Sequence, residues 1–173
     1  MSYIESVKEF HESFEHPINS HKNNIDLKLR QLRVKLLFEE LEELATASDV
    51  LSTFSKLCSE SIDKNRDSVD GYNVDKKEEI DALCDIQYVL SGAVLVLGYQ
   101  DIFDDAFNEV HRSNMSKMCS NMEEVSKTQE LYNNKGVDST FIKKDNGFIV
   151  LRKEDNKVLK NVNYSEANLE RFI

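Results

Sequence analysis

Residues 29–44 have the sequence LRQLRVKLLFEELEEL, in which a leucine-rich first half gives way to four glutamates. At 100° per residue, five side chains of this stretch fall within an arc of about 80°, the width of one packed helix face: Leu29, Leu32, Leu36, Glu40 and Glu43. Glu39 lies beside this arc, whereas Glu42 points nearly the opposite way. Phe38, Leu41 and Ala45 form another apolar side. The pattern predicts a largely buried helix over residues 26–47, with Glu40 and Glu43 facing the core.

A second acidic stretch, residues 78–99, has the sequence EEIDALCDIQYVLSGAVLVLGY. The same counting places five residues on one arc of about 80°: Glu78, Asp81, Asp85, Tyr88 and Gly92. Glu79 points away from them. The apolar surroundings predict an interior helix over residues 75–97 that stops at Gly98, a residue suited to ending helices.

Carboxylates gathered in a protein interior repel one another and lose hydration, so they need protons or cations as compensation. Helix bundles often supply a shared divalent metal, held by carboxylates on facing helices. Ligation by oxygen alone, with no histidine or cysteine on either acidic arc, favours Mg²⁺ or Mn²⁺. The alternative for residues 39–43 taken alone is an ordinary acidic face in solvent.

Composition limits the class of protein. A chain of 173 residues with 40% apolar and 31% charged residues, five glycines and one proline predicts one helical domain. The net charge of −10 argues against binding of a nucleic acid polymer. Without a long apolar run or a signal-like N-terminus, we expect no membrane association and a cytoplasmic protein. The three cysteines, widely spaced, are expected to be reduced thiols.

Apolar periodicity and turn residues predict the remaining elements. Principal helices are expected over residues 2–15, 26–47 and 75–97, and a fourth from Asp101, as its cap, to Met118. A shorter helix is expected over residues 49–63, followed by a loop over 63–73. Two short strands are expected around a turn at 153–156. The predicted fold class is all-α: a four-helix bundle with a short extended or β-hairpin C-terminal tail.

The two acidic stretches together resemble the all-α nucleoside triphosphate pyrophosphohydrolase superfamily, which includes the MazG proteins, the phosphoribosyl-ATP pyrophosphohydrolases and the dimeric dUTPases. Its signature is EExxE on one helix and ExxD on a later one, and residues 39–43 match the first element. VKEFHESFEHPI (7–18), FNEVHRSNMSKM (107–118) and NKVLKNVNYSEANL (156–169) are similar to the opening helix, fourth helix and closing segment of the MazG-like branch.

The second element departs from the family pattern, because Ala82 stands three residues before Asp85. Asp81 can substitute, or Glu78 with Asp81 can form the literal ExxD. The gap between the motifs is also longer than usual, so residues 48–74 resemble an insertion. The implied organisation is a MazG-like helical domain over 1–125, with this insertion, and a C-terminal extension over 126–173 packed on the bundle or on a neighbouring subunit.

The resemblance implies a metal-dependent hydrolase that cleaves a nucleoside triphosphate between the α and β phosphates and assembles as a homodimer or homotetramer. Its metal ligands would be Glu39, Glu40, Glu43, Glu78, Asp81 and Asp85. Glu39 and Glu40 are the candidate catalytic residues, and one of them, with Glu39 preferred, would orient or deprotonate the attacking water. The cofactor would be Mg²⁺ or Mn²⁺.

The resemblance also extends the candidate site to substrate-binding residues. Phosphate contacts are expected from His111, Arg112, Asn114 and Lys117, although cations at a helix end also favour the helix dipole without any ligand. Further candidates are His11, Phe14 and His16 for the base, Tyr88, and Lys157 and Lys160 for phosphate. Two other functions stay open: phosphoribosyl-ATP hydrolysis in histidine synthesis, and a non-catalytic bundle that binds nucleotide or divalent ion.

Overall fold

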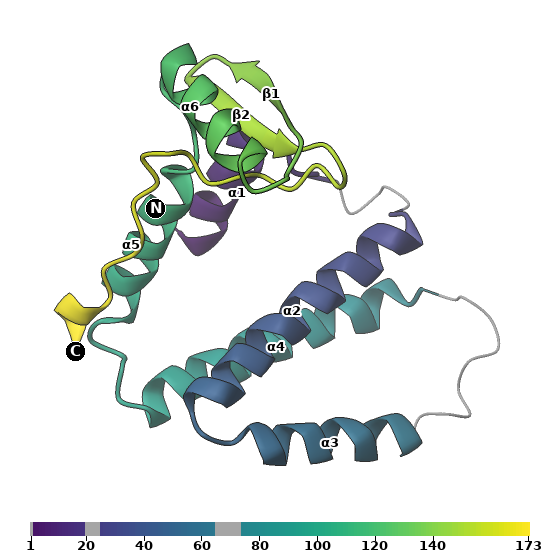
Figure 1. The fold of residues 1–173 in the computed structure, drawn as a ribbon. Helices are drawn as coiled ribbons and strands as arrows, with labels where there is room; N and C mark the ends of the chain where they lie inside the picture. The colour runs from purple at the N-terminus through teal and green to yellow at the C-terminus, as the bar shows by residue number, and fades with distance from the viewer. Residues whose placement is uncertain (1, 20–24, 65–73) are drawn as a thin grey trace. The chain divides into compact units, whose positions relative to one another are not determined.

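The computed structural model describes residues 2–19, 25–64 and 74–173 (Figure 1). In these residues the chain forms six α-helices, a two-stranded sheet and a short 3₁₀ helix: α1 (Tyr3–Ser13), α2 (Leu27–Ala47), α3 (Leu51–Lys64), α4 (Lys76–Val96), α5 (Phe103–Met115), α6 (Met122–Asn133), β1 (Ser139–Lys144), β2 (Gly147–Arg152) and η2 (Glu170–Phe172). The prediction of a mostly helical chain with a C-terminal hairpin is confirmed. The prediction of a four-helix bundle is not confirmed.

The helix ends follow from capping residues. Ser2 and Glu5 form a reciprocal capping box at α1, and the Asp26 carboxylate accepts a hydrogen bond from the Lys28 amide at the start of α2. Gly98, just after α4, has φ +82°, the left-handed conformation that ends a helix at little cost in glycine. The predicted Asp101 cap is wrong, because α5 begins after Ile102 with no side-chain cap.

The chain divides into two compact units, residues 1–18 with 85–173 and residues 19–84. Unit 1 comprises residues 1–18 and 85–173, and unit 2 comprises residues 19–84. The division into residues 1–125 and 126–173 stays a prediction, as does the insertion at 48–74. The predicted helix over 49–63 is present as α3, whereas most of the predicted loop over 63–73 lies outside the described residues.

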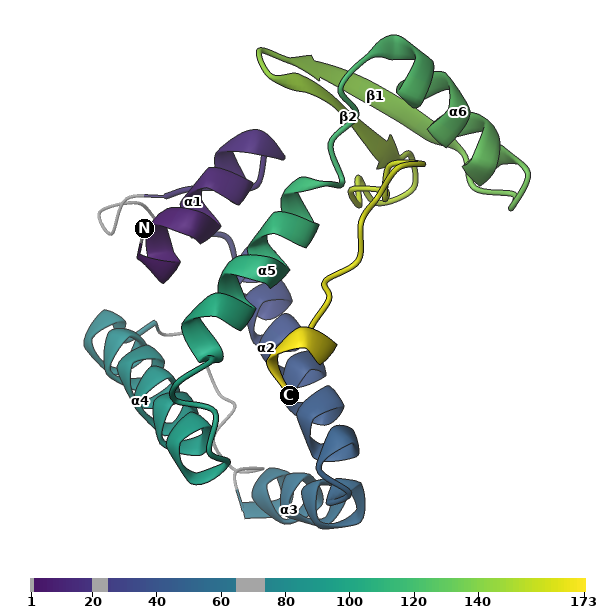
Figure 2. The same cartoon turned by 90° about the vertical axis from the view of Figure 1, so that its left-hand side faces the viewer.

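In unit 1, α1 and α5 lie side by side (Figures 1 and 2). The Tyr3 ring lies 4.6 Å from that of Phe107, and Glu9 Oε2 lies 3.2 Å from His111 Nε2. An early residue of α1 contacts an early residue of α5, and a later residue of α1 contacts a later residue of α5. The two helices therefore run in the same direction.

The sheet packs against α6, and β1 and β2 are antiparallel, with Ser139 opposite Arg152 and Lys144 opposite Gly147. The strands are joined by the two-residue turn at 145–146, and the predicted turn at 153–156 follows β2 instead. There the chain doubles back, so that Val158 bridges Leu151.

The apolar core of unit 1 lies between the hairpin and the helices around it. One cluster contains Cys119, Val125, Val150 and Leu159, and a second contains Phe14, Ile149 and Leu151. Phe10, Met115 and Met118 pack against the second cluster. Burial on both faces of β2 therefore fixes the hairpin to α1, α5 and α6.

In unit 2, α2 packs against α3, where the rings of Phe38 and Phe54 lie 5.4 Å apart. Ala45 is buried, but most of the other apolar side chains of α2 are exposed. The prediction that α2 is largely buried is therefore wrong for this single chain. Helical periodicity identifies which side of a helix is apolar, but it does not identify what covers that side.

Candidate functional site

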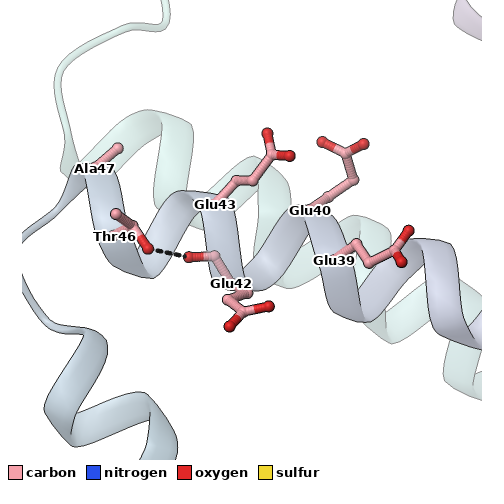
Figure 3. Close-up of a pocket in the computed structure, with 6 residues that line it drawn as sticks. All are labelled: Glu39, Glu40, Glu42, Glu43, Thr46 and Ala47. Carbon is pink, nitrogen blue, oxygen red and sulfur yellow. Dashed lines mark hydrogen bonds between the residues drawn. The ribbon is translucent and has the colours of Figure 1, made fainter.

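The first acidic motif lines a shallow hollow on α2 with a volume of about 540 Å³. The hollow is open to solvent because its walls come from a single helix. The residues that line it are Glu39, Glu40, Glu42, Glu43, Thr46 and Ala47. Figure 3 shows Glu40 and Glu43 projecting from the same side of α2, whereas Glu42 projects from the opposite side. This is the arrangement that helical phase requires for residues three apart.

The carboxylates of this motif are accessible. Glu40 and Glu43 are exposed, and Glu39 is half-buried with its Oε1 3.4 Å from Lys35 Nζ. The apolar side chains on the same side are exposed too, and Leu32 retains 46% and Leu36 39% of their accessible surface. Glu40 and Glu43 thus lie on an apolar side that the described part of this chain leaves uncovered. They do not lie in a core.

The second acidic group lies on α4. Asp75 accepts hydrogen bonds from the Lys77 and Glu78 amides at the start of this helix, which places Glu78 in the first turn. The candidate ligands Glu78, Asp81 and Asp85 are exposed, as is Tyr88. Lys77 Nζ lies 3.5 Å from Glu78 Oε1.

An ion pair between Arg30 and Glu79 joins the first turns of α2 and α4 within unit 2. At a rise of about 1.5 Å per residue, Glu40 lies roughly 15 Å along α2 from Arg30, whereas Asp81 lies roughly 3 Å along α4 from Glu79. The two acidic groups of unit 2 therefore lie at different distances along their helices from this ion pair. Among the described residues, no three Asp, Glu, His or Cys side chains are grouped closely enough to hold a metal ion.

The predicted phosphate-binding residues of α5 already have protein partners. His111 pairs with Glu9, and Asn114 Oδ1 accepts a hydrogen bond of 2.7 Å from Lys117 Nζ. Arg112 makes two parallel hydrogen bonds of 2.9 Å to the Glu109 carboxylate. Its Nη2 also donates to the carbonyl oxygen of Glu166.

Glu109 is the residue of this region that sequence reasoning missed. It is buried, and it accepts hydrogen bonds from Arg112, from the Asn168 amide at 2.9 Å and from Arg171 at 3.4 Å. The hydrogen bonds from Arg112, followed by that from Asn168, lower the pKa of Glu109 to about 2. Arg112 therefore serves to hold the C-terminal chain on α5. A carboxylate three residues before an arginine in a helix was the available signal.

The N-terminal candidates are packed among themselves. His11 Nδ1 lies 3.1 Å from the Pro17 carbonyl oxygen, and the His16 ring stacks on Phe10 at 5.4 Å. Phe14 retains only 2% of its accessible surface. A ring so buried stabilises the core of unit 1 and has no free face for a nucleobase.

The tail carries the last two candidates, Lys157 and Lys160, both exposed. Lys160 Nζ lies 4.2 Å from the centre of the Tyr164 ring and 3.8 Å from Glu166 Oε1. The hydroxyl of Tyr164 is 2.9 Å from Ser113 Oγ on α5. The structure therefore brings Lys160 close to the C-terminal end of α5, beyond which Lys117 lies.

Comparison with protein families identifies the class. The model of the phosphoribosyl-ATP pyrophosphohydrolase family matches residues 7–114, which contain both acidic stretches and most of α5. The chain belongs to this family, which indicates a hydrolase of the pyrophosphohydrolase type and confirms the resemblance drawn from the motifs. Comparisons with curated proteins and with solved structures gave no match. No helix in the described ranges combines the length and the apolarity needed to cross a membrane.

Proposed function

We propose that this chain is a metal-dependent nucleoside triphosphate pyrophosphohydrolase that cleaves between the α and β phosphates and releases pyrophosphate. One observation carries the proposal: the EExxE carboxylates share an accessible hollow on α2, inside the region matched by the family model. A triphosphate is highly charged, so its hydrolysis needs cations at the phosphate oxygens. An acidic surface can provide those cations only by holding metal ions.

The donor chemistry of the acidic residues fits a hard divalent ion. Carboxylate oxygens are the ligands that Mg²⁺ and Mn²⁺ prefer, and Mg²⁺ binds through few carboxylates while keeping positions for phosphate. The ligands we propose are Glu39, Glu40, Glu43, Glu78, Asp81 and Asp85. Bound Mg²⁺ would neutralise phosphate charge and make a coordinated water more acidic.

The chain's own residues would then orient and deprotonate the attacking water. Glu39 or Glu40 can accept its proton, because both carboxylates reach the hollow. Lys117 and Asn114 can hold the phosphate chain through charge-assisted and ordinary hydrogen bonds.

We propose a homodimer or homotetramer as the active form. Within unit 2, apolar side chains are exposed on α2, α3 and α4, among them Phe38, Leu57 and Leu83. A surface of this kind is typical of an interface between subunits. A second copy of the chain would cover it and lower the exposure of the EExxE carboxylates.

Two other functions have specific support. Phosphoribosyl-ATP hydrolysis is favoured by the description of the matching family. A non-catalytic bundle that binds nucleotide or divalent ion is favoured by the different distances of the acidic groups from the Arg30–Glu79 ion pair along α2 and α4.

The decisive experiment measures pyrophosphate release from ribo- and deoxynucleoside triphosphates and from phosphoribosyl-ATP, with Mg²⁺ and with chelator. Glu40→Gln should lower turnover at least about 100-fold, and Glu42→Gln, on the opposite side of α2, should leave it within about twofold. Release from phosphoribosyl-ATP alone would favour the second function. No release from any compound by folded protein would reject hydrolysis.

A further inference from the structure

The two edges of the sheet differ in their backbone hydrogen bonds. On the outer edge of β2, Phe148 exchanges two hydrogen bonds with Cys119, at 2.7 and 2.8 Å. On the same edge the Leu159 amide donates to the Val150 oxygen at 2.8 Å. The chain segments before and after the hairpin therefore cover this edge of the sheet.

Alternation along the strands identifies the other edge, which belongs to β1. Since Phe148 and Val150 bond away from β1, the residues beside them on β2 bond towards it, as antiparallel pairing requires. By the register of the sheet, the backbone groups of Ser139, Phe141 and Lys143 then point away from β2. A side-chain amide of α6 donates at 3.4 Å to the Ser139 oxygen. Within the described ranges, the backbone amides and carbonyls of Phe141 and Lys143 have no hydrogen-bond partner.

An open backbone edge is a template for a further strand. Strand β1 lacks two of the usual obstacles to such pairing, a proline and a bulge, because residues 139–144 all pair with β2 in an unbroken register. Phe141, in the middle of the open edge, retains 38% of its accessible surface, although its ring lies 6.1 Å from that of Phe148. Lysines can also discourage edge pairing, but Lys143 and Lys144 both lie at one end of β1.

We propose that β1 is an interface at which a second copy of this chain pairs in the antiparallel direction, with Phe141 opposite its own counterpart on a two-fold axis. The two hairpins would then form one continuous four-stranded sheet, and the outward backbone groups of residues 139, 141 and 143 would all have partners. This surface lies beyond residue 114, where the family match ends. Such pairing goes beyond the proposed function, since it does not depend on hydrolysis of any nucleotide.

The charges at the two ends of β1 select this partner and this direction. With Phe141 on the axis, Lys144 lies opposite the partner's Asp138, and no two like charges within residues 138–144 lie opposite each other. Asp138 is exposed, and Lys144 Nζ also lies 3.2 Å from Glu15 Oε1 of its own chain. Cross-strand pairs of opposite charge stabilise a sheet, whereas like charges directly opposite destabilise it. A parallel copy in register would place each lysine beside its own counterpart.

The β1 edge is separate from the exposed apolar helices of unit 2, since β1 belongs to unit 1. One two-fold interface gives a dimer, and two different two-fold interfaces on the same chain can close into a tetramer. Pairing along six residues is short, so the β1 interface alone should be weak and should depend on protein concentration.

The first test is disulfide formation on the two-fold axis, in the full chain with Cys58→Ser and Cys84→Ser. Phe141→Cys places the two thiols on directly opposite residues, whose Cα atoms lie about 5.5 Å apart in an antiparallel pair, within the span of a disulfide. Thr140→Cys is the matched control, because Thr140 is also exposed but stands opposite the partner's Ile142. With oxidised glutathione, Phe141→Cys should form a covalent dimer at least about tenfold faster than Thr140→Cys.

The second test is amide hydrogen exchange of the wild-type chain, measured residue by residue at increasing protein concentration. Exchange at the Phe141 and Lys143 amides should slow at least about tenfold as copies pair. The Ile142 amide, which points towards β2, should stay protected at every concentration. This alternation along β1 distinguishes strand pairing from a general gain in stability.

The outcomes separate the β1 interface from the proposed function. Faster cross-linking of Phe141→Cys than of Thr140→Cys, together with alternating protection, supports the interface even if no nucleotide is hydrolysed. Equal cross-linking of the two variants overturns it. Rapid exchange at Phe141 and Lys143 at every concentration also overturns it, even if the chain is an active hydrolase that assembles through unit 2. Because the exchange test uses the wild type, it stays valid if Phe141→Cys fails to fold.

Discussion

Gly147 is the position where one added carbon should have the largest local effect. Its φ is +152°, and a Cβ placed there would lie 2.5 Å from the Cys119 carbonyl oxygen and 3.0 Å from Met118 Cγ. That oxygen accepts the Phe148 amide at 2.7 Å, and the Cys119 amide donates to the Phe148 oxygen at 2.8 Å. Gly147→Ala must therefore strain the backbone and also push β2 away from residues 118–119.

The expected cost can be built from these contacts. Two backbone hydrogen bonds contribute about 0.5–1.5 kcal/mol each, and a strained backbone position costs about 1–3 kcal/mol. Since the positive φ strains an alanine whatever the space around it, the two costs add, and we expect Gly147→Ala to lower the free energy of unfolding by about 2–6 kcal/mol. Gly136→Ala is the control, because Gly136 has φ +72° but no atom within 4 Å of an added Cβ. It should cost about 1–2 kcal/mol.

Urea unfolding gives the free energies, and hydrogen exchange at the Cys119 and Phe148 amides gives the local effect. The local measurement is needed because unfolding of a chain with two units need not be a single transition. Exchange at both amides should accelerate in Gly147→Ala and stay slow in Gly136→Ala. If Gly147→Ala destabilises no more than its control and both amides stay protected, the packing argument is refuted.

Three further predictions concern unit 1. The pKa of Glu109 is lowered from 4.5 to about 2, so the contribution of its ion pair to stability is complete above about pH 4.5 and is lost as pH falls towards 2. The melting temperatures of wild type and Glu109→Gln should therefore converge as pH falls over this range. Burial raises the pKa of the Cys119 thiol, so a thiol reagent at neutral pH should modify Cys119 only after denaturant is added; modification in native protein would contradict this. Thr128→Val removes the acceptor of the Val162 amide, a hydrogen bond of 2.9 Å, and should cost about 1 kcal/mol in urea unfolding, with no loss arguing that the bond is dispensable.

The helices that sequence predicted best are those with both an apolar stripe and a cap. The predicted bounds of α2 and α4 differ from the observed ones by at most one residue at each end, because Asp26 and Asp75 begin these helices and Gly98 ends α4 by local chemistry. Helix α6 was missed. Its buried side chains are Val125 and Thr128, which are too few and too mixed in polarity to form a clear stripe.

The turn that joins the two strands of the hairpin was predicted at the wrong residues. Residues 153–156 have strong turn chemistry, and they do form a turn with Asn156 at φ 58°. The strands are nevertheless joined at 145–146, because Gly147 allows β2 to pack on Cys119. Choosing between two good turns requires tertiary contacts that the local sequence does not contain.

The candidate site could be predicted only as far as helical phase reaches. Phase separated Glu40 and Glu43 from Glu42, and Figure 3 shows the same separation. Phase could not predict the contact between α2 and α4, which in unit 2 includes the ion pair of Arg30 with Glu79. The family resemblance implied a phosphate contact for Arg112, whereas the structure pairs Arg112 with Glu109.

The division of unit 1 between residues 1–18 and 85–173 has a consequence for the order of folding. Helix α1 contacts partners such as Phe107 and His111 that lie about a hundred positions later in the chain, so its docking must close a very long loop. The entropic free-energy cost of closing such a loop rises by only about 0.6 kcal/mol for each doubling of loop length. Helix α1 should therefore join α5 and the hairpin late, after contacts of shorter sequence separation have formed. Large changes in the length of residues 19–84 would then alter the stability of unit 1 very little, which leaves the segment carrying the EExxE motif free to lengthen or shorten in evolution.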